Sequence, residues 1–237
     1  MTKIKICGIT NYEDAQNAID LGADFLGFNF YNKSPRYLDY HKSNDIIQKL
    51  NGKSKIVGVF VNETIEKINQ ICNHCNPDLI QLSGDEDINF IEKLRKLTNK
   101  KIIKSFRIKN EINKINSKLI NYFNSDYVMI DTFKEGFYGG TGKSFDLNTI
   151  KDIDNKKLFL GGGLNEKNVN AAIKKLNPFA VDVCSSIEYV HGKKDFSKMK
   201  QFIGAVKCRK VEIFEHDQKP LTDNHLGKGK SGLKGVF

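Results

Sequence analysis

The sequence lacks any apolar run that approaches the roughly 18 residues of a membrane-spanning helix. Its first residues, Met1–Ile6, contain no hydrophobic stretch of signal-peptide length. Tryptophan is absent, whereas phenylalanine is plentiful at 16 residues and charged residues make up 28% of the chain. This balance is typical of a soluble globular protein. We therefore expect a cytoplasmic protein with no membrane partner.

Cysteine is scarce, and its five residues are scattered along the 237 positions. An odd, scattered set is no disulfide framework and favours a reducing compartment. The only cluster with metal-like spacing is Cys72-Asn73-His74-Cys75. A structural zinc site takes about four ligands, commonly from two such pairs, and no second pair exists here. Ordinary helix packing is the favoured interpretation, and we expect no metal.

The chain also lacks a concentrated block of one charge. Its 38 lysines and arginines exceed its 28 acidic residues, so the net charge is +10. A positive balance can indicate a nucleic-acid partner. Here, however, the lysines are spread along the whole chain, as solvated helix faces require. We expect no nucleic-acid partner, and an anionic small substrate would also suit this charge.

The sequence does contain a regular alternation of short apolar runs and longer helical stretches. The runs predict eight strands, at residues 3–9, 24–30, 55–61, 78–82, 101–106, 126–131, 157–161 and 179–183. A helix is expected after each strand, at residues 12–21, 43–50, 64–72, 87–97, 111–122, 147–152, 166–176 and 196–206.

The strands are near-continuous apolar runs, such as Ile56-Val57-Gly58-Val59-Phe60-Val61. Runs of this kind are buried on both faces, as parallel strands under helices are. Eight units of roughly 25 residues predict a single (β/α)₈ TIM-barrel domain over residues 1–206. Residues 207–237 are rich in Gly and Lys and are expected to form a polar, basic, flexible extension, with an edge-strand pattern at 210–214.

In such a barrel the active site lies at the carboxyl ends of the strands. Strand ends deliver Cys7 and Asp131 from opposite sides of the barrel mouth, and the pair suits proton transfer. Other interpretations stay open, because a free cysteine is commonly a buried core residue and an aspartate commonly caps a helix or pairs with a lysine. The loops after the last two strands are rich in Gly and Ser and precede helices. Their backbone N–H groups predict an anion site and hence a phosphorylated substrate.

Several motifs follow one another on this scaffold: Lys5-Ile6-Cys7-Gly8-Ile9-Thr10, Ser34-Pro35-Arg36-Tyr37, Gly58-Val59-Phe60-Val61-Asn62, Gly139-Gly140-Thr141-Gly142, Gly162-Gly163-Leu164 and Val181-Asp182-Val183. Together they resemble the phosphoribosylanthranilate isomerase family, from the first strand to the last helix. The resemblance implies a cofactor-independent aldose–ketose isomerase of tryptophan biosynthesis. Its reaction is the Amadori rearrangement of N-(5′-phosphoribosyl)anthranilate to 1-(o-carboxyphenylamino)-1-deoxyribulose 5-phosphate.

The same resemblance implies roles for single residues. Asp131 would be the general acid that opens the ribose ring, and Cys7, as a thiolate, would remove the C2′ proton. Arg36 would hold the anthranilate carboxylate, while Gln81 and Asp182 would contact the substrate. The remaining matched positions are a phosphate site, Gly162, Gly163, Ser185 and Ser186, and a mobile loop, Gly139, Gly140, Thr141 and Gly142.

Two positions depart from the family pattern. Ser83 stands where the family usually has His, so a ring contact to the substrate is expected to be missing. The usual Ser-Ser-Gly after the last strand is Cys184-Ser185-Ser186 here, and the side chain of Ser186 either crowds the phosphate or gives it another donor. We expect neither departure to touch the acid–base pair, so activity is expected. The oligomeric state stays open between a monomer and a homodimer.

Two alternatives remain at this stage. A phosphoribosyl-formimino carboxamide isomerase is a similar barrel with an Amadori-type reaction, but such barrels typically use two aspartates and lack a cysteine at the first strand's end. A basic RNA- or anion-binding barrel without the chemistry has only the net charge of +10 in its favour. Cys7 and the ordered acid–base pair favour the anthranilate isomerase.

Overall fold

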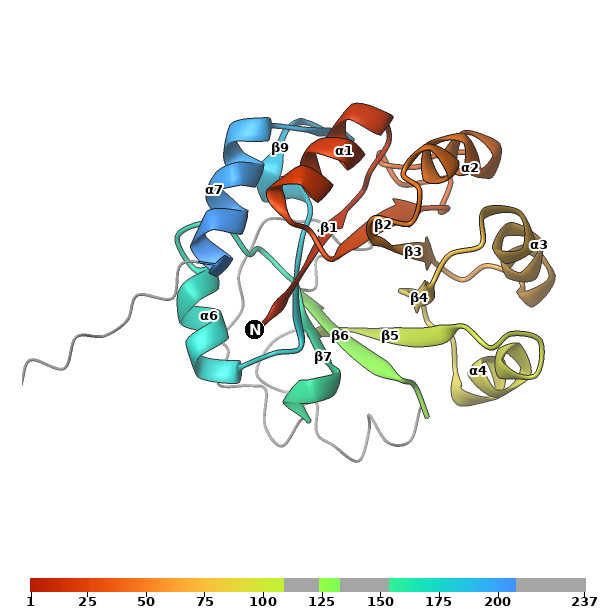
Figure 1. Cartoon of the computed structure of the whole chain (residues 1–237). Coiled ribbons are helices and arrows are strands. Elements are labelled where there is room, and N and C mark those ends of the chain that lie inside the picture. Colours follow the sequence, from red (N-terminus) through yellow and green to blue (C-terminus); the bar gives the residue numbers. More distant parts are fainter. Residues whose placement is uncertain (109–123, 133–153, 208–237) are drawn as a thin grey trace, which may run out of the picture.

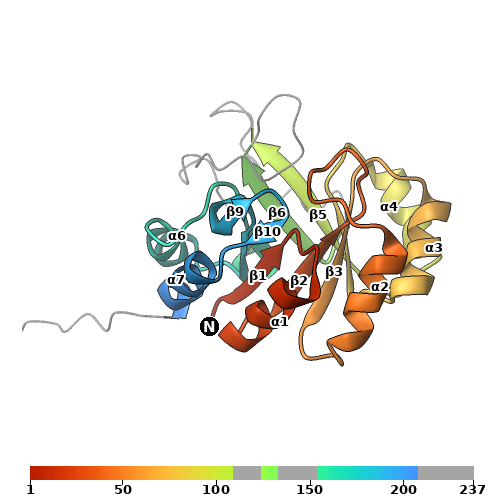
Figure 2. The same ribbon diagram turned by 90° about the horizontal axis from the view of Figure 1, so that it is seen from above.

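The computed structural model of the chain describes residues 1–108, 124–132 and 154–207. Eight parallel strands form a closed barrel, in which each strand pairs with the next along the chain and β8 pairs with β1. Helices surround the strands (Figures 1 and 2). The predicted (β/α)₈ TIM barrel is confirmed.

The barrel strands are β1 (Lys3–Cys7), β2 (Phe25–Asn29), β3 (Lys55–Phe60), β4 (Leu79–Leu82), β5 (Lys101–Ile108), β6 (Tyr127–Thr132), β7 (Leu158–Leu160) and β8 (Ala180–Val183). The described helices are α1 (Tyr12–Leu21), α2 (Tyr40–Lys49), α3 (Ile65–Cys75), α4 (Ile88–Arg95), α6 (Val169–Leu176) and α7 (Phe196–Lys207). The short elements are the 3₁₀ turns η2 (Asn155–Lys157) and η3 (Ser185–Ile187) and the hairpin strands β9 (Glu188–Val190) and β10 (Lys193–Lys194).

Every barrel strand matches its prediction to within one or two residues at each end. The helices differ more. Helix α2 begins at Tyr40, earlier than predicted, because the Asp39 carboxylate caps it by accepting from the backbone N–H of His41. Helix α3 continues to Cys75 because Asn76, in the left-handed conformation, ends it. The β9–β10 hairpin was not predicted, and the predicted elements at 111–122, 147–152 and 210–214 lie outside the described residues.

Two apolar layers hold the barrel together. The outer layer packs strand side chains such as Ile4 and Ile6 against helix side chains such as Ile68 and Phe202. The inner layer comes from strand residues alone and fills the barrel: Cys7, Phe25, Val57, Val59, Leu79, Ile103, Met129, Phe159 and Ala180. Because alternate residues of each strand face the two layers, both faces are apolar, which explains the continuous apolar runs in the sequence.

An aromatic cluster closes the amino-terminal end of the barrel interior. Its members, Phe25, Tyr127, Phe159 and Phe179, have neighbouring ring centroids 5.0 to 6.2 Å apart. They stand at or next to the first residues of their strands. Because these rings fill the amino-terminal end of the barrel, a polar site is expected at the carboxyl ends of the strands.

The Cys72-Asn73-His74-Cys75 cluster lies on α3, with both thiols buried in the outer apolar layer. Burial raises the pKa of Cys72 to about 11 and that of Cys75 to about 12. Within the described residues, no group of three or more His, Cys, Asp and Glu side chains is arranged to hold a metal ion. The same part of the chain contains no helix long and apolar enough to cross a membrane.

Candidate active site

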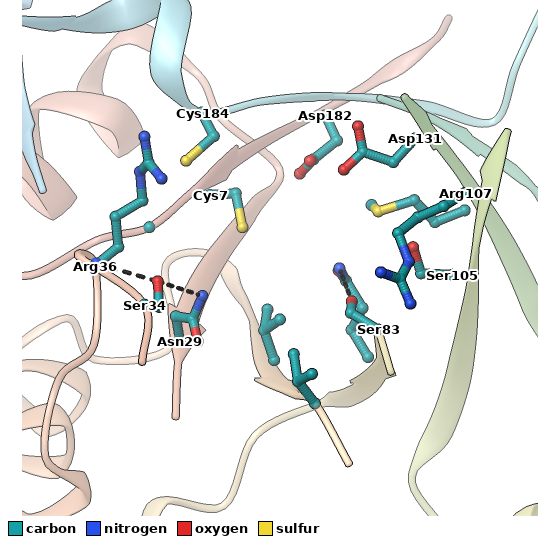
Figure 3. A pocket seen from close by; sticks show the side chains of 15 residues that line it. Cys7, Asn29, Ser34, Arg36, Ser83, Ser105, Arg107, Asp131, Asp182 and Cys184 are labelled. Atoms are coloured by element: carbon teal, nitrogen blue, oxygen red, sulfur yellow. Dashed lines mark hydrogen bonds between the residues drawn. The ribbon is translucent and has the colours of Figure 1, made fainter. Parts of the chain in front are cut away.

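A cavity opens at the carboxyl ends of the barrel strands (Figure 3). It brings together the predicted residues Cys7, Arg36, Gln81, Asp131 and Asp182. A second, smaller pocket is lined by the predicted phosphate-site residues and shares two carboxylates with the first: Gly162, Gly163, Ser185, Ser186, Asp131 and Asp182. The predicted mobile loop, at 139–142, lies outside the described residues.

Cys7 ends β1 and turns its sulfur into the barrel, where it is 9% exposed. Its neighbour on β2 is Gly27, and a Cβ there would stand 2.8 Å from the sulfur. Two residues before Cys7, on the same face, Lys5 is fully buried and its Nζ lies 2.6 Å from Asp182 Oδ1. Burial alone would lower the pKa of Lys5, but the Asp182 carboxylate raises it above its ordinary value. A permanent cation therefore lies next to the thiol.

The thiol of Cys184 is the second neighbour of Cys7 at the cavity wall. Hydrogen bonding with this thiol lowers the pKa of Cys7 to about 6. Burial acts in the opposite direction, and the charge of Lys5 lowers the pKa further. These surroundings therefore favour the thiolate form of Cys7. The expectation that neither family departure touches the acid–base pair is wrong for Cys184, because β8 and β1 are paired neighbours in the closed barrel.

Arg36 is 6% exposed and forms a two-bond ion pair with Glu188 of β9. Its Nε lies 2.9 Å from Glu188 Oε1, and its Nη2 lies 2.7 Å from Oε2. Lys194 of β10 also reaches Glu188, with its Nζ 2.9 Å from Oε1. Burial tends to raise the pKa of Glu188, but Arg36 and Lys194 lower it below its ordinary value. The arginine therefore lines the cavity while two nitrogens of its guanidinium group, Nε and Nη2, are already bound to Glu188.

Sequence reasoning missed Glu188 and Lys194. Glu188 is 152 residues from Arg36 along the chain, and no local pattern links them. A signal was nevertheless present, because both follow the last barrel strand, at the same end as the predicted phosphate loop. Arg107, at the end of β5, was missed as well, although the strand-end rule that selected Asp131 also applies to it. Its Nη2 lies 3.0 Å from Asp85 Oδ1.

Gln81 lines the cavity and has a hydrogen-bond acceptor without a partner. The side chain is 4% exposed, and its Nε2 donates to Ser83 Oγ at 2.9 Å. Its Oε1 is buried without a hydrogen-bond partner. Buried polar atoms are normally paired, so an unpaired one in a cavity wall suits a substrate donor. The Ser83 hydroxyl accepts this hydrogen bond and so orients the Gln81 amide.

Asp131 and Asp182 lie where the two pockets meet, since both residues line both pockets. Figure 3 shows the two carboxylates on the same side of the cavity. The prediction placed Asp131 across the barrel mouth from Cys7. In the structure β6 is separated from β1 by β7 and β8 only, so the two residues are closer around the barrel than opposite strands would be.

The pocket predicted to hold the phosphate is built from two loops. Gly162 and Gly163 have φ angles of +84° and +68°, the left-handed region that favours glycine. The hydroxyl of Ser186 donates to the carbonyl of Leu164 at 2.5 Å and so ties the two loops together.

The two loops lead into helical structure in different ways. Neither loop runs directly into an α-helix, because Asn165 and Asn168 side chains cap a turn before α6 and the second loop enters η3. The contribution of helix N-termini to an anion site here stays a prediction, and the 3₁₀ turn η3 begins at the predicted site residue Ser185.

Comparison with known proteins identifies a family. The profile of N-(5′-phosphoribosyl)anthranilate isomerases matches residues 4–205. The N-(5′-phosphoribosyl)anthranilate isomerase of Aquifex aeolicus is 44% identical over 210 residues, 87% of this chain and 99% of the relative. Monomers of the dimeric phosphoribosylanthranilate isomerase of Thermotoga maritima superpose with a TM-score of 0.73 at 36% identity, over 87% of this chain and 99% of theirs.

A further solved structure is a phosphoribosylanthranilate isomerase in complex with reduced 1-(o-carboxyphenylamino)-1-deoxyribulose 5-phosphate. It superposes with a TM-score of 0.72 at 36% identity, over 87% of this chain and 99% of that one. The similarity therefore spans the barrel and both of its pockets.

Proposed function

The chain belongs to the N-(5′-phosphoribosyl)anthranilate isomerase family, and from this premise we propose how its own residues carry the reaction. Its activity is phosphoribosylanthranilate isomerisation in tryptophan biosynthesis, an intramolecular oxidoreduction. The observation that carries the proposed mechanism is the buried Cys7 thiol, which is beside a buried lysine and faces the same cavity as Asp131.

Asp131 is the general acid, and Cys7 is the general base. Asp131 protonates the ring oxygen of the ribose, the bond from C1′ to that oxygen breaks, and the anthranilate nitrogen becomes the cationic nitrogen of a Schiff base. That charge acidifies the C2′ hydrogen. The Cys7 thiolate removes this proton, and the resulting enol tautomerises to the ketone. The low pKa of Cys7 supports the assignment, because the thiolate is the form that accepts a proton.

The two pockets suit the two ends of the substrate. We place the phosphate in the small pocket with Gly162, Gly163, Ser185 and Ser186. The anthranilate lies in the larger cavity, with its carboxylate at Arg36 and a substrate N–H or O–H at Gln81 Oε1. Asp182 contacts the amine and hydroxyl groups of the ribose between them. The position of both aspartates at the junction of the pockets supports this placement, since the ribose must span it.

The surroundings of the enzyme are proposed on the same basis. We propose a cytoplasmic, cofactor-independent enzyme that acts on a phosphorylated small molecule and needs no nucleic acid. The Thermotoga maritima relative is dimeric, and a homodimer is one of the two oligomeric states expected for this chain.

Substitution of the acid and the base tests the mechanism. We expect Cys7→Ala and Asp131→Asn each to lower kcat by about 10²- to 10⁴-fold, the usual contribution of a general base or acid. KM should change much less, because the groups that bind the two ends of the substrate remain. The assay is the loss of anthranilate-type fluorescence from freshly made phosphoribosylanthranilate.

Arg36→Ala is the contrasting variant. Removal of a substrate-binding group should act mainly on KM, so its pattern should differ from that of the acid–base variants. If Cys7→Ala kept more than about half of the wild-type kcat with chemistry rate-limiting, Cys7 would not be the base.

A further inference from the structure

Two thiols, not one, face the active-site cavity. The β1–β8 register pairs Lys5 with Asp182 and Ile6 with Val183. The next residues in this register are Cys7 and Cys184, and Figure 3 shows both side chains at the same wall of the cavity. The Cys184 sulfur packs closely against the end of β1, since a Cβ on Gly8 would stand 3.0 Å from it.

We propose that Cys184 is a positioning residue for the reaction: its S–H donates a hydrogen bond to the Cys7 sulfur and holds Cys7 as the thiolate that removes the C2′ proton. The proposal rests on the proposed role of Cys7 as the base. A thiol is a weak donor, but a bond to an anionic acceptor is stronger than one between neutral groups. In a dry site this single bond therefore has a measurable effect.

The charges around the two sulfurs decide which of them ionises. The groups that face the pair from neighbouring elements are Lys5 of β1, Arg36 after β2, Asp182 of β8, Glu188 of β9 and Lys194 of β10.

Lys194 Nζ is 3.8 Å from the Cys184 sulfur, but it is only 2.9 Å from the Glu188 carboxylate, which offsets its charge. Glu188 Oε1 lies 3.9 Å from that sulfur, as a second acceptor for the Cys184 S–H, and its negative charge disfavours a second anion there. Cys7, by contrast, has the buried Lys5 cation beside it, and the charge of Lys5 lowers the pKa of Cys7. Cys184 therefore keeps its proton, with its pKa raised well above the ordinary value by the bond to Cys7 and by burial.

The test measures the ionisation of Cys7 directly, without turnover. The full-length protein is treated with iodoacetamide across a range of pH, and alkylation of Cys7 is followed by mass spectrometry of its peptide. Cys184→Ala should move the midpoint of this profile upward by at least about one pH unit, which is about a tenfold decrease in the acid dissociation constant of the Cys7 thiol. Cys184→Ser, which keeps a donor, should stay near the wild type.

A matched control removes a buried thiol elsewhere. Cys72→Ala deletes a buried sulfur on α3, away from the cavity, and should leave the Cys7 profile unchanged. Should Cys184→Ala fail to fold, Cys184→Val provides a second variant without a donor. In the folded variants, the acid limb of the kcat profile should move with the alkylation midpoint, while KM should change little.

The outcomes separate this proposal from the proposed function. If folded Cys184→Ala or Cys184→Val alkylates with the wild-type midpoint, Cys184 does not hold the thiolate, and the proposal is overturned even if Cys7 is the base. The same follows if Cys184→Ser shifts the midpoint as far as Cys184→Ala. If the midpoint shifts as expected but Cys7→Ala remains active, the thiol pair exists, and the role of Cys7 in the proposed function is what fails.

Discussion

At the residue scale, the site depends on buried charges that are held in pairs. Lys5 is fully buried and is balanced by Asp182, and Arg36 is balanced by Glu188. Removing one member of such a pair leaves an uncompensated buried charge, which typically costs about 3–5 kcal/mol. The site thus keeps a cation next to Cys7 through pairings that only the assembled barrel provides.

The lowered pKa of Cys7 predicts a pH-dependent contribution to stability. Its pKa falls from the ordinary 9.0 to about 6 on folding. A group whose pKa is lower in the folded state stabilises that state. Its contribution is complete when the pH is above the pKa of the unfolded state, and it is lost as the pH falls through the pKa of the folded state. The free energy of unfolding of the wild type, minus that of Cys7→Ser, should therefore rise between about pH 6 and about pH 8. Urea denaturation at the two pH values measures it.

The test compares how the unfolding free energies of the wild type and Cys7→Ser change with pH. Ionisations elsewhere in the chain affect both proteins and largely cancel. A flat difference between the two proteins across this pH range would contradict the thiolate assignment. A difference that falls with pH would indicate that folding favours the neutral thiol, as burial alone would make it do.

At the element scale, short connections at the carboxyl ends of the strands carry the chemistry. The β9–β10 hairpin places Glu188 and Lys194 at Arg36, and it is anchored to the start of α1, where Asp14 Oδ2 accepts from the Lys194 backbone N–H at 2.9 Å. The Thr10 hydroxyl also donates to the Gly192 carbonyl. These contacts hold a two-stranded element that is too short to be stable by itself.

The glycine turn after β7 is predicted to be needed for phosphate binding. Gly162→Val puts a branched side chain at a φ of +84° in the pocket wall. We expect it to raise KM and weaken competitive inhibition by inorganic phosphate, because it blocks the close approach of the backbone to the anion. Steady-state kinetics with added phosphate measures both effects.

Gly52→Val is the matched control. Gly52 also has a left-handed φ, +70°, and a Cβ there would meet no atom within 4 Å. This variant therefore carries a similar backbone strain away from both pockets, and it should lose stability without a change in phosphate inhibition. Normal phosphate inhibition of Gly162→Val would show that the anion binds elsewhere.

At the scale of the whole molecule, closure of the barrel places the first strand, β1, beside the last barrel strand, β8. β1 pairs with both β2 and β8, so Cys7 lies beside residues from the far end of the barrel. The residues of both pockets lie between Cys7 and Ser186, inside the family match at 4–205. The match to the Aquifex aeolicus relative includes 87% of this chain and 99% of the relative.

A chain that ends at Lys207 is therefore predicted to keep its activity. Helix α7 ends at this residue, and every residue assigned a role in the reaction precedes it. Both kcat and KM should stay within about twofold of the full-length values, because the groups that bind and react are unchanged. The fluorescence assay on both lengths measures this. A large loss of kcat in a folded truncated chain would assign residues 208–237 a part in the reaction.

Much of the architecture was determined by the sequence alone. Continuous apolar runs located all eight strands, because burial on both faces is recorded in the composition of each strand. The strand-end rule selected Cys7 and Asp131, since a parallel barrel delivers every strand end to one face, and the family resemblance added Asp182. The predicted loop at 139–142 is not described by the structure.

Only the tertiary structure decided which side chains meet. The pairing of Arg36 with Glu188 and the meeting of Cys7 with Cys184 join residues more than 150 positions apart, across the closure of β8 onto β1. The low pKa of Cys7 follows from that closure. Sequence periodicity reports the environment of each strand, but hydrogen bonds and charge pairs depend on distances in space, which no local pattern contains.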